Sequence, residues 1–162
     1  VGTRTHQRSI GSKSTLKDLE KWVNTLIETN DWGVGMTHGL TYGYDAFRNP
    51  QRLWDHLDQV KARENEIWVG TFREVASYIK EREETKLEVV NKKNTLLIAP
   101  ELKLDQELFV EPLTMVITGK EIKKVTVKQG KRRLPVQITD DKVLFDFDPY
   151  GGMIKVTLKI QK

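Results

Sequence analysis

The sequence contains no cysteine, which excludes disulfides, thiolate metal sites and a cysteine nucleophile. It has no apolar run long enough to span a bilayer, and no charged-then-apolar signal segment follows Val1. Histidine is also scarce, with three residues among 162. A catalytic centre that uses imidazole therefore has few candidates.

Positive charge is only slightly in excess, with 27 Lys and Arg against 23 Asp and Glu. The basic residues concentrate in VKQGKRRLP, residues 127–135, where no aromatic residue is interleaved with them. Binding of single-stranded nucleic acid uses aromatic side chains as stacking platforms. We therefore interpret Gln129, Gly130 and Lys131 as a solvated hairpin turn, and we predict no nucleic-acid partner.

The first half of the chain, to about Glu84, alternates between helical and strand patterns. Apolar residues recur at helical spacing over residues 16–27. Thr15 followed by Asp18 is a signal for the start of this helix. The next apolar run predicts a short buried strand at residues 33–37.

Two further helices and one further strand are expected before Glu84. Asn49 and Pro50 open the second helix, and Thr71 with Glu74 forms a capping box for the third. Between them, EIWVG at residues 66–70 predicts a strand parallel to the first. The second helix is expected to bury Leu53, Trp54, Leu57 and Val60, and Trp32, Trp54 and Trp68 are all expected in the core.

The period changes to two after the charged run KEREET, residues 80–85. The segments LTMVITG, KKVTVKQ, KVLFDF and GMIKVTLKI alternate apolar and polar residues and are separated by turn signals. Six or seven short strands of this kind predict a small antiparallel β-sandwich. We therefore expect two domains, residues 1–84 and 85–162.

The first half supplies few strands for a parallel sheet: two, or three if VGTRT at residues 1–5 ends another. Parallel strands need both faces covered, and so small a sheet leaves little to cover. This half is thus more plausible as the end of a larger β/α barrel than as a complete fold.

Three consecutive segments resemble the closing portion of polysaccharide deacetylases, the NodB-homology family. They are DWGVGMTHGLTYGYD, NPQRLWDHLDQVKAREN and IWVGTFREVASYIKERE. The resemblance implies the closing β/α units of a distorted parallel barrel, with the β-sandwich that bacterial members often append. It also implies a polysaccharide or oligosaccharide substrate, zinc or a similar divalent metal in the parent enzyme, and a periplasmic or secreted location.

The resemblance assigns the general acid of the family to His38. An imidazole titrates near neutral pH, so it can protonate the sugar oxygen as the tetrahedral intermediate collapses. Tyr42 and Tyr44 offer flat faces to a sugar ring. Arg4 is placed near the site if VGTRTHQRS corresponds to the preceding strand. Catalytic His38 and substrate-binding Tyr42, Tyr44 and Arg4 are the site residues that we predict.

The chain departs from the family because it contains neither the Asp pair nor the H-x-x-x-H metal motif. His6 is isolated, and His56 has no partner ligand at the helical i, i+4 spacing. We predict no metal site in this chain, and alone it should neither bind zinc tightly nor deacetylate. An Asp-Asp and an H-x-x-x-H encoded before Val1 would indicate the enzyme. The alternative is a non-catalytic carbohydrate-binding or scaffold module.

Two local alternatives stay open, and one partner is expected. His38 is either a site residue or a strand-end histidine satisfied by local hydrogen bonds. Asp45 either bonds His38 or stabilises the turn before Ala46. If the first half is the end of a barrel, its open strand edge should be covered by a second copy or an N-terminal fragment of the same protein.

Overall fold

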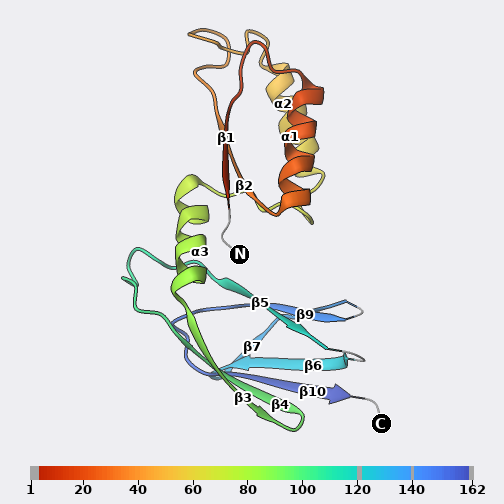
Figure 1. The fold of residues 1–162 in the computed structure, drawn as a ribbon, viewed down its shortest axis with the longest axis vertical. Coiled ribbons are helices and arrows are strands. Elements are labelled where there is room, and N and C mark those ends of the chain that lie inside the picture. The colour runs from red at the N-terminus through yellow and green to blue at the C-terminus, as the bar shows by residue number, and fades with distance from the viewer. Residues whose placement is uncertain (1–3, 120–121, 140, 161–162) are drawn as a thin grey trace. The chain divides into compact units, whose positions relative to one another are not determined.

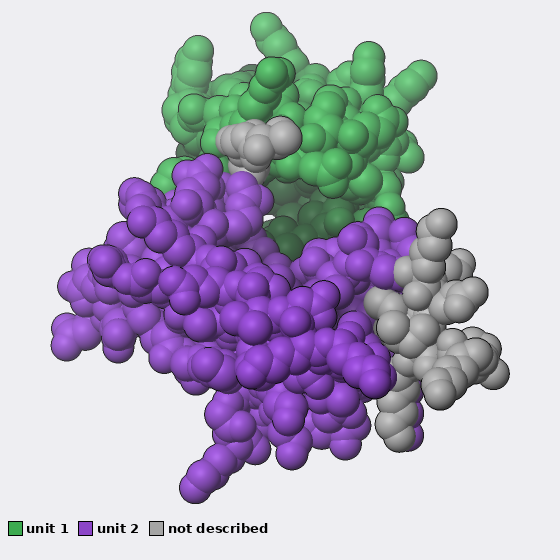
Figure 2. Space-filling view, turned by 60° about the horizontal axis from the view of Figure 1, so that its bottom comes forward, with its two compact units in different colours: residues 1–72 green, residues 73–162 purple. Residues whose placement is uncertain are grey.

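The computed structural model describes residues 4–119, 122–139 and 141–160. The chain divides into two compact units, residues 1–72 and 73–162 (Figure 2). The charged run at residues 80–85, where the sequence indicates the boundary, overlaps the end of helix α3 (Phe72–Glu84), and nearly all of α3 belongs to the second unit. Within the described ranges, no helix is both long and apolar enough to cross a membrane.

The first unit is built on a β-α-β unit. Strands β1 (Thr5–Ser9) and β2 (Trp32–Met36) pair in parallel, with helix α1 (Leu16–Thr29) between them in sequence (Figure 1). The predicted start signal at Thr15 and Asp18 is confirmed, and it takes the form of a capping box. The Asp18 N–H donates to the Thr15 hydroxyl over 3.1 Å, and the Thr15 N–H donates to the Asp18 carboxylate over 3.1 Å. The predicted helix and the predicted strand before His38 are both present.

Gly33 of β2 lets α1 pack closely on the strand pair. A Cβ built on Gly33 would lie 2.2 Å from Leu26 Cδ1, whereas one built on Gly35 would be in ordinary contact with the Trp22 ring at 3.6 Å. Because side chains alternate along a strand, the larger residues of β2 face away from α1. One of them, Met36, is 39% exposed, so the prediction of a buried strand was wrong.

No strand forms at residues 66–70, which corrects a second prediction. A local turn precedes this segment: the backbone N–H groups of Glu66 and Ile67 both donate to the carbonyl of Arg63. The Arg63 guanidinium also bonds the Glu66 carboxylate. Trp68, expected in the core, is 53% exposed. An apolar run without a neighbouring strand to pair with is therefore not enough to form a strand.

Helix α2 (Gln51–Lys61) begins after Pro50, as predicted, and the Asn49 side chain accepts from the Gln51 N–H. Its buried face is the predicted one only in part, since Leu53 packs against the core but Trp54 and Leu57 do not lie inside. His56 is 5% exposed, whereas Trp54 and Leu57 are 44% and 45% exposed.

The reason for this orientation is the side chain of Arg52. Its guanidinium donates to the carbonyls of Ser12 and Ser14 over 3.0 and 2.9 Å. Residues four apart share one face of a helix, so these bonds turn His56 inward together with Arg52.

The second unit contains α3 and two antiparallel sheets. One sheet has the order β3-β4-β10-β6-β7, and the other has the order β5-β9-β8 (Figure 1). The strands are β3 (Lys86–Lys92), β4 (Thr95–Glu101), β5 (Leu113–Thr118), β6 (Ile122–Gln129), β7 (Arg132–Leu134), β8 (Gln137–Ile138), β9 (Lys142–Phe147) and β10 (Ile154–Ile160). The predicted turn between β6 and β7 is present, with Gly130 at φ 54°. The prediction that Gln129 is solvated was wrong: this residue is 8% exposed, and its side-chain amide donates to the Asp148 carbonyl over 2.6 Å.

The two sheets share one hydrophobic core, as in a β-sandwich. Its buried residues are Ile98, Leu113, Val125, Val127, Leu134, Val143, Phe145, Phe147, Ile154 and Val156. Tyr78 of α3 packs against the same cluster. The described part of the chain is therefore mixed α/β, and none of its sheets closes into a barrel.

Glu81 of α3 is a fully buried carboxyl group, with 0% of the residue exposed. Its Oε1 accepts from the backbone N–H of Glu111 over 3.0 Å. Its Oε2 is buried without a hydrogen-bond partner in the described part of the chain. Burial raises the pKa of Glu81, and the charges of Glu111 and Asp148 raise it further. Folding therefore favours the neutral form of this group.

We predict that Glu81→Gln stabilises the protein above neutral pH. The pKa of Glu81 is higher in the folded protein than in the unfolded chain. Below the pKa of the unfolded chain, the carboxyl is neutral in both states and does not destabilise the fold. As the pH rises through the pKa of the folded protein, the protein loses this stability. Chemical unfolding should show a gain of about 1 kcal/mol at pH 8 and none near pH 4. Glu83→Gln, an exposed change on the same helix, should show no such trend, and an equal trend in both variants would contradict the assignment.

The strand pair of the first unit is open on both edges among the described residues. The Trp32 N–H donates to the Arg4 carbonyl, and the Ile10 N–H donates to the Met36 carbonyl. Because donors alternate along a parallel ladder, the backbone groups of Gly33 and Gly35 point away from β1. Those of Thr5, Gln7 and Ser9 point away from β2.

We expect at least one open edge of the β1-β2 pair to be covered by a partner. The chain should therefore not be a free monomer at micromolar concentration. We expect the partner to be a second copy or an N-terminal fragment of the same protein. Sedimentation should detect the association, and Gln7→Pro should weaken it by removing an outward N–H. A monomer of 18.8 kDa that unfolds cooperatively would contradict the prediction.

Candidate functional site

The candidate site is the loop that follows the carboxyl end of β2, residues 37–47. It carries three exposed rings that the sequence singled out: His38, Tyr42 and Tyr44. Tyr42 is 88% exposed and Tyr44 is 82% exposed. The carboxyl ends of parallel strands are where α/β proteins gather ligand-binding groups. The fold thus places these rings where a ligand can reach them.

His38 contacts Tyr44 directly. The two ring centroids lie 5.4 Å apart, and the rings meet edge to face at 79°. Among the described residues, the His38 ring makes no hydrogen bond, so the alternative of a locally satisfied histidine has no support. The imidazole is therefore exposed beside an aromatic ring, where a bound molecule can contact it.

Asp45 fixes the end of this loop to the segment that follows β1. Its Oδ1 accepts from the Ser12 N–H over 3.1 Å and from the Ser12 hydroxyl over 2.5 Å. The Ser12 hydroxyl, through this bond, is the main cause that lowers the pKa of Asp45. A Cβ on Gly11 would lie 2.0 Å from the Asp45 carbonyl oxygen, so only glycine permits this close approach. Of the two alternatives for Asp45, the structure supports stabilisation of the turn.

The loop is closed at its other end by glycine and by the core. A Cβ on Gly39 would lie 2.3 Å from the Tyr42 carbonyl oxygen, so the chain can fold back only at a glycine. The Phe47 N–H donates to the Gly39 carbonyl over 3.3 Å. Ala46 and Phe47 are buried, at 3% and 2% exposure. The loop therefore presents Tyr42 and Tyr44 on an anchored base.

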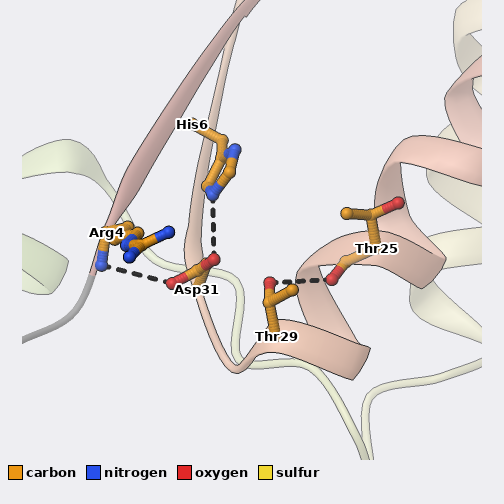
Figure 3. Close-up of polar contacts among 5 residues, drawn as sticks. All are labelled: Arg4, His6, Thr25, Thr29 and Asp31. Atoms are coloured by element: carbon orange, nitrogen blue, oxygen red, sulfur yellow. Dashed lines mark hydrogen bonds and ion pairs between the residues drawn. The ribbon is translucent and has the colours of Figure 1, made fainter. Parts of the chain in front are cut away.

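Arg4 is not part of this loop. It precedes β1 at the opposite end of the strand pair, where its backbone N–H donates to the Asp31 carboxylate over 3.2 Å (Figure 3). Five strand residues separate the two ends, on the order of 17 Å. The structure therefore brings His38 and the two tyrosines together but leaves Arg4 apart from them.

Asp31 also binds His6, whose Nε2 lies 2.8 Å from the carboxylate (Figure 3). The pKa of Asp31 is lowered by the neighbouring side chains of Thr29 and His6. The Thr29 hydroxyl donates to the carbonyl of Thr25 over 2.8 Å. This cluster joins the end of α1 to the start of both strands. The hydrogen bonds of this cluster therefore serve to hold the helix end and the two strands together.

The histidines do not assemble a metal site. Burial lowers the pKa of His56, which favours its neutral form inside the packed first unit. Within the described ranges, no group of three or more His, Cys, Asp or Glu side chains is placed to hold a metal ion. Catalytic zinc is held by three protein ligands. The described residues therefore do not fit the metal that the deacetylase family implies.

Comparison of the sequence with protein-family models and with curated proteins found no match. The resemblance to polysaccharide deacetylases therefore remains a prediction from the residues quoted above.

Sequence reasoning missed the bond between Ser12 and Asp45, because these residues are distant in the sequence. The only local signal was Asp45 itself in a glycine-rich loop. We predict that Asp45→Asn loosens the loop, because a neutral amide accepts weaker hydrogen bonds than a carboxylate. Asparagine tolerates the positive φ of 49° at this position, so backbone strain is not introduced.

Amide hydrogen exchange measures this effect directly. In Asp45→Asn, the amides of Ser12 and of residues 38–44 should exchange about fivefold to tenfold faster, while those of β1 and β2 stay unchanged. Asp58→Asn, an exposed change on α2, is the matched control. Equal exchange rates for the loop in the wild type and in Asp45→Asn would show that the carboxylate does not hold it.

Proposed function

We propose that this chain is the C-terminal part of a carbohydrate deacetylase, which hydrolyses acetyl groups from a polysaccharide. The observation that carries the proposal is an exposed histidine, His38, directly beyond the carboxyl end of a parallel strand and edge-on to an exposed tyrosine. The sequence resemblance of residues 15–84 supports the same assignment.

His38 supplies the proton that the departing sugar group requires. Water adds to the acetyl carbonyl and gives a tetrahedral intermediate. When that intermediate collapses, the bond from the acetyl carbon to the sugar breaks, and acetate is released. A protonated imidazole next to this bond transfers its proton to the sugar and can recover one from the attacking water. His38 is exposed enough for both transfers.

Tyr42 and Tyr44 supply the binding surface. An aromatic ring offers an apolar face to the C–H groups of a sugar while its hydroxyl remains in water. Because Tyr44 lies against His38, a sugar stacked on this tyrosine places its substituents next to the imidazole. Arg4, which was predicted to bind substrate, is left out of this proposal because it lies at the other end of the strand pair.

The metal ligands of such an enzyme are not among the described residues. We propose that they belong to another part of the natural polypeptide that contains this chain. No step of the reaction is assigned to a metal here. The contribution of this chain is the proton donor and the aromatic surface beside it.

The second candidate function is a non-catalytic carbohydrate-binding module. It is favoured by the exposure of Tyr42 and Tyr44, because two exposed tyrosines on one anchored loop can hold a sugar without any catalytic group. The two candidates share the binding surface and differ in whether His38 reacts.

The test replaces His38 in the natural polypeptide that contains this chain and measures deacetylation of N-acetylglucosamine oligomers. His38→Gln should lower kcat by about 10²–10⁴-fold, the usual scale for the loss of a positioned general acid. Oligomer affinity should change little, because the tyrosines remain. His6→Gln, which alters the histidine at the opposite end of the strand pair, is the matched control.

Unchanged turnover in His38→Gln would contradict the catalytic role. If the wild type binds the oligomers without turnover, and Tyr44→Ala abolishes binding, the non-catalytic module is the correct function. Loss of turnover in both His38→Gln and His6→Gln would indicate a structural effect on the strand pair.

A further inference from the structure

The outer face of the five-stranded sheet collects positive charge. In β6 the sequence KVTVK, residues 124–128, places Val125 and Val127 in the core, so both lysines face outward. In β10, Ile154 and Val156 are buried, and Lys155 between them is exposed. Burial of one face of each strand therefore forces lysines onto the other.

The register aligns these cations across the sheet. Lys155 of β10 lies opposite Lys128 of β6, and Lys128 lies opposite Arg133 of β7. In the next row, Thr157 lies opposite both Thr126 and Thr95. We call Lys124, Lys128, Arg133 and Lys155, with the threonine row, the cationic face.

The described residues of β6, β7 and β10 supply no negative charge to the cationic face, and the acidic residues of this sheet, Glu88 and Glu101, lie on β3 and β4. Strands β6, β7 and β10 contain no aspartate or glutamate. Among the described residues, no carboxylate forms an ion pair with any of its four cations. Like charges directly opposite each other destabilise a pair of strands. An external anion would relieve this repulsion.

We propose that the cationic face binds a polysaccharide that carries carboxylate groups. Charge complementarity selects a polyanion, and the threonine row selects one whose charges are spaced among hydroxyl groups. Lys124 and Lys128 are four residues apart on one strand, roughly 13 Å. The choice of a sugar polymer rests on the proposed function, whereas the need for an anion does not.

A nucleic acid fits this face less well. Duplex DNA carries one charge per approximately 1.7 Å, far denser than the cations of this face. Single strands are held by stacking of bases on aromatic side chains, and the described positions of β6, β7 and β10 include no aromatic residue. A sparse row of lysines beside hydroxyl groups matches a polyuronate better.

The test measures binding of polygalacturonate by calorimetry at low salt, with its fully methyl-esterified form as the neutral comparison. The full chain should bind the acid polymer and not the ester. The triple variant Lys128→Gln, Arg133→Gln, Lys155→Gln should lower the affinity by about a hundredfold, since each of the three cations contributes about fivefold near an anionic surface. The affinity of the wild type should also fall steeply with added salt.

Two controls isolate the cationic face. A second triple variant removes the same charge from exposed positions in the first unit: Lys13→Gln, Lys17→Gln, Lys21→Gln. Its affinity for polygalacturonate should lie within twofold of that of the wild type. Lys128→Arg, Lys155→Arg keeps the charges and should retain binding. Because the triple variant removes repulsion between opposed strands, its Tm should be equal to or above that of the wild type.

The proposal is overturned if the wild type binds neither polymer, binds both equally, or loses affinity equally in the two triple variants. Tighter binding of duplex DNA, dextran sulfate or vesicles containing phosphatidylserine would also overturn it, in favour of that partner. His38→Gln should bind polygalacturonate as the wild type does. Failure of the deacetylase proposal is therefore detected by turnover alone, and failure of this one by binding alone.

Discussion

The pairing of β10 between β4 and β6 is the interaction on which the second unit depends. The last strand of the chain completes the larger sheet, since β4 and β6 do not pair with each other. Its residues Ile154 and Val156 are both fully buried in the core shared with the smaller sheet. A slip of one residue would bury Lys155 and expose both of them, so the register is strongly specified.

The first unit depends on a different constraint, which is how closely backbone segments can approach each other. Gly33 lets α1 pack on β2, and Gly11 lets the segment after β1 meet the loop after β2. A two-stranded sheet provides little apolar surface, so short-range contacts of this kind must supply much of its order. The same contacts fix the base of the loop that carries His38.

Most of the helices and the sandwich were predictable because their signals are local. The capping box of α1 and the period-two alternation of the last strands are examples. The failures have one cause in common. The orientation of α2 is set by Arg52 bonding to Ser12 and Ser14, and residues 66–70 have no strand beside them. Both depend on partners distant in the sequence, which hydrophobic patterns do not specify.

The same distinction applies to the two candidate sites. His38, Tyr42 and Tyr44 lie within seven residues of one another, so their proximity could be predicted, but Arg4 required knowing which end of the strand pair it occupies. The cationic face needed the register of three strands before Lys128, Arg133 and Lys155 could be seen as neighbours. Folding requires only that the alternate positions of these strands be polar, and threonine or serine would satisfy that requirement without repulsion. The concentration of unpaired cations there therefore exceeds what the fold needs, and binding of an anion gives a physical reason for it.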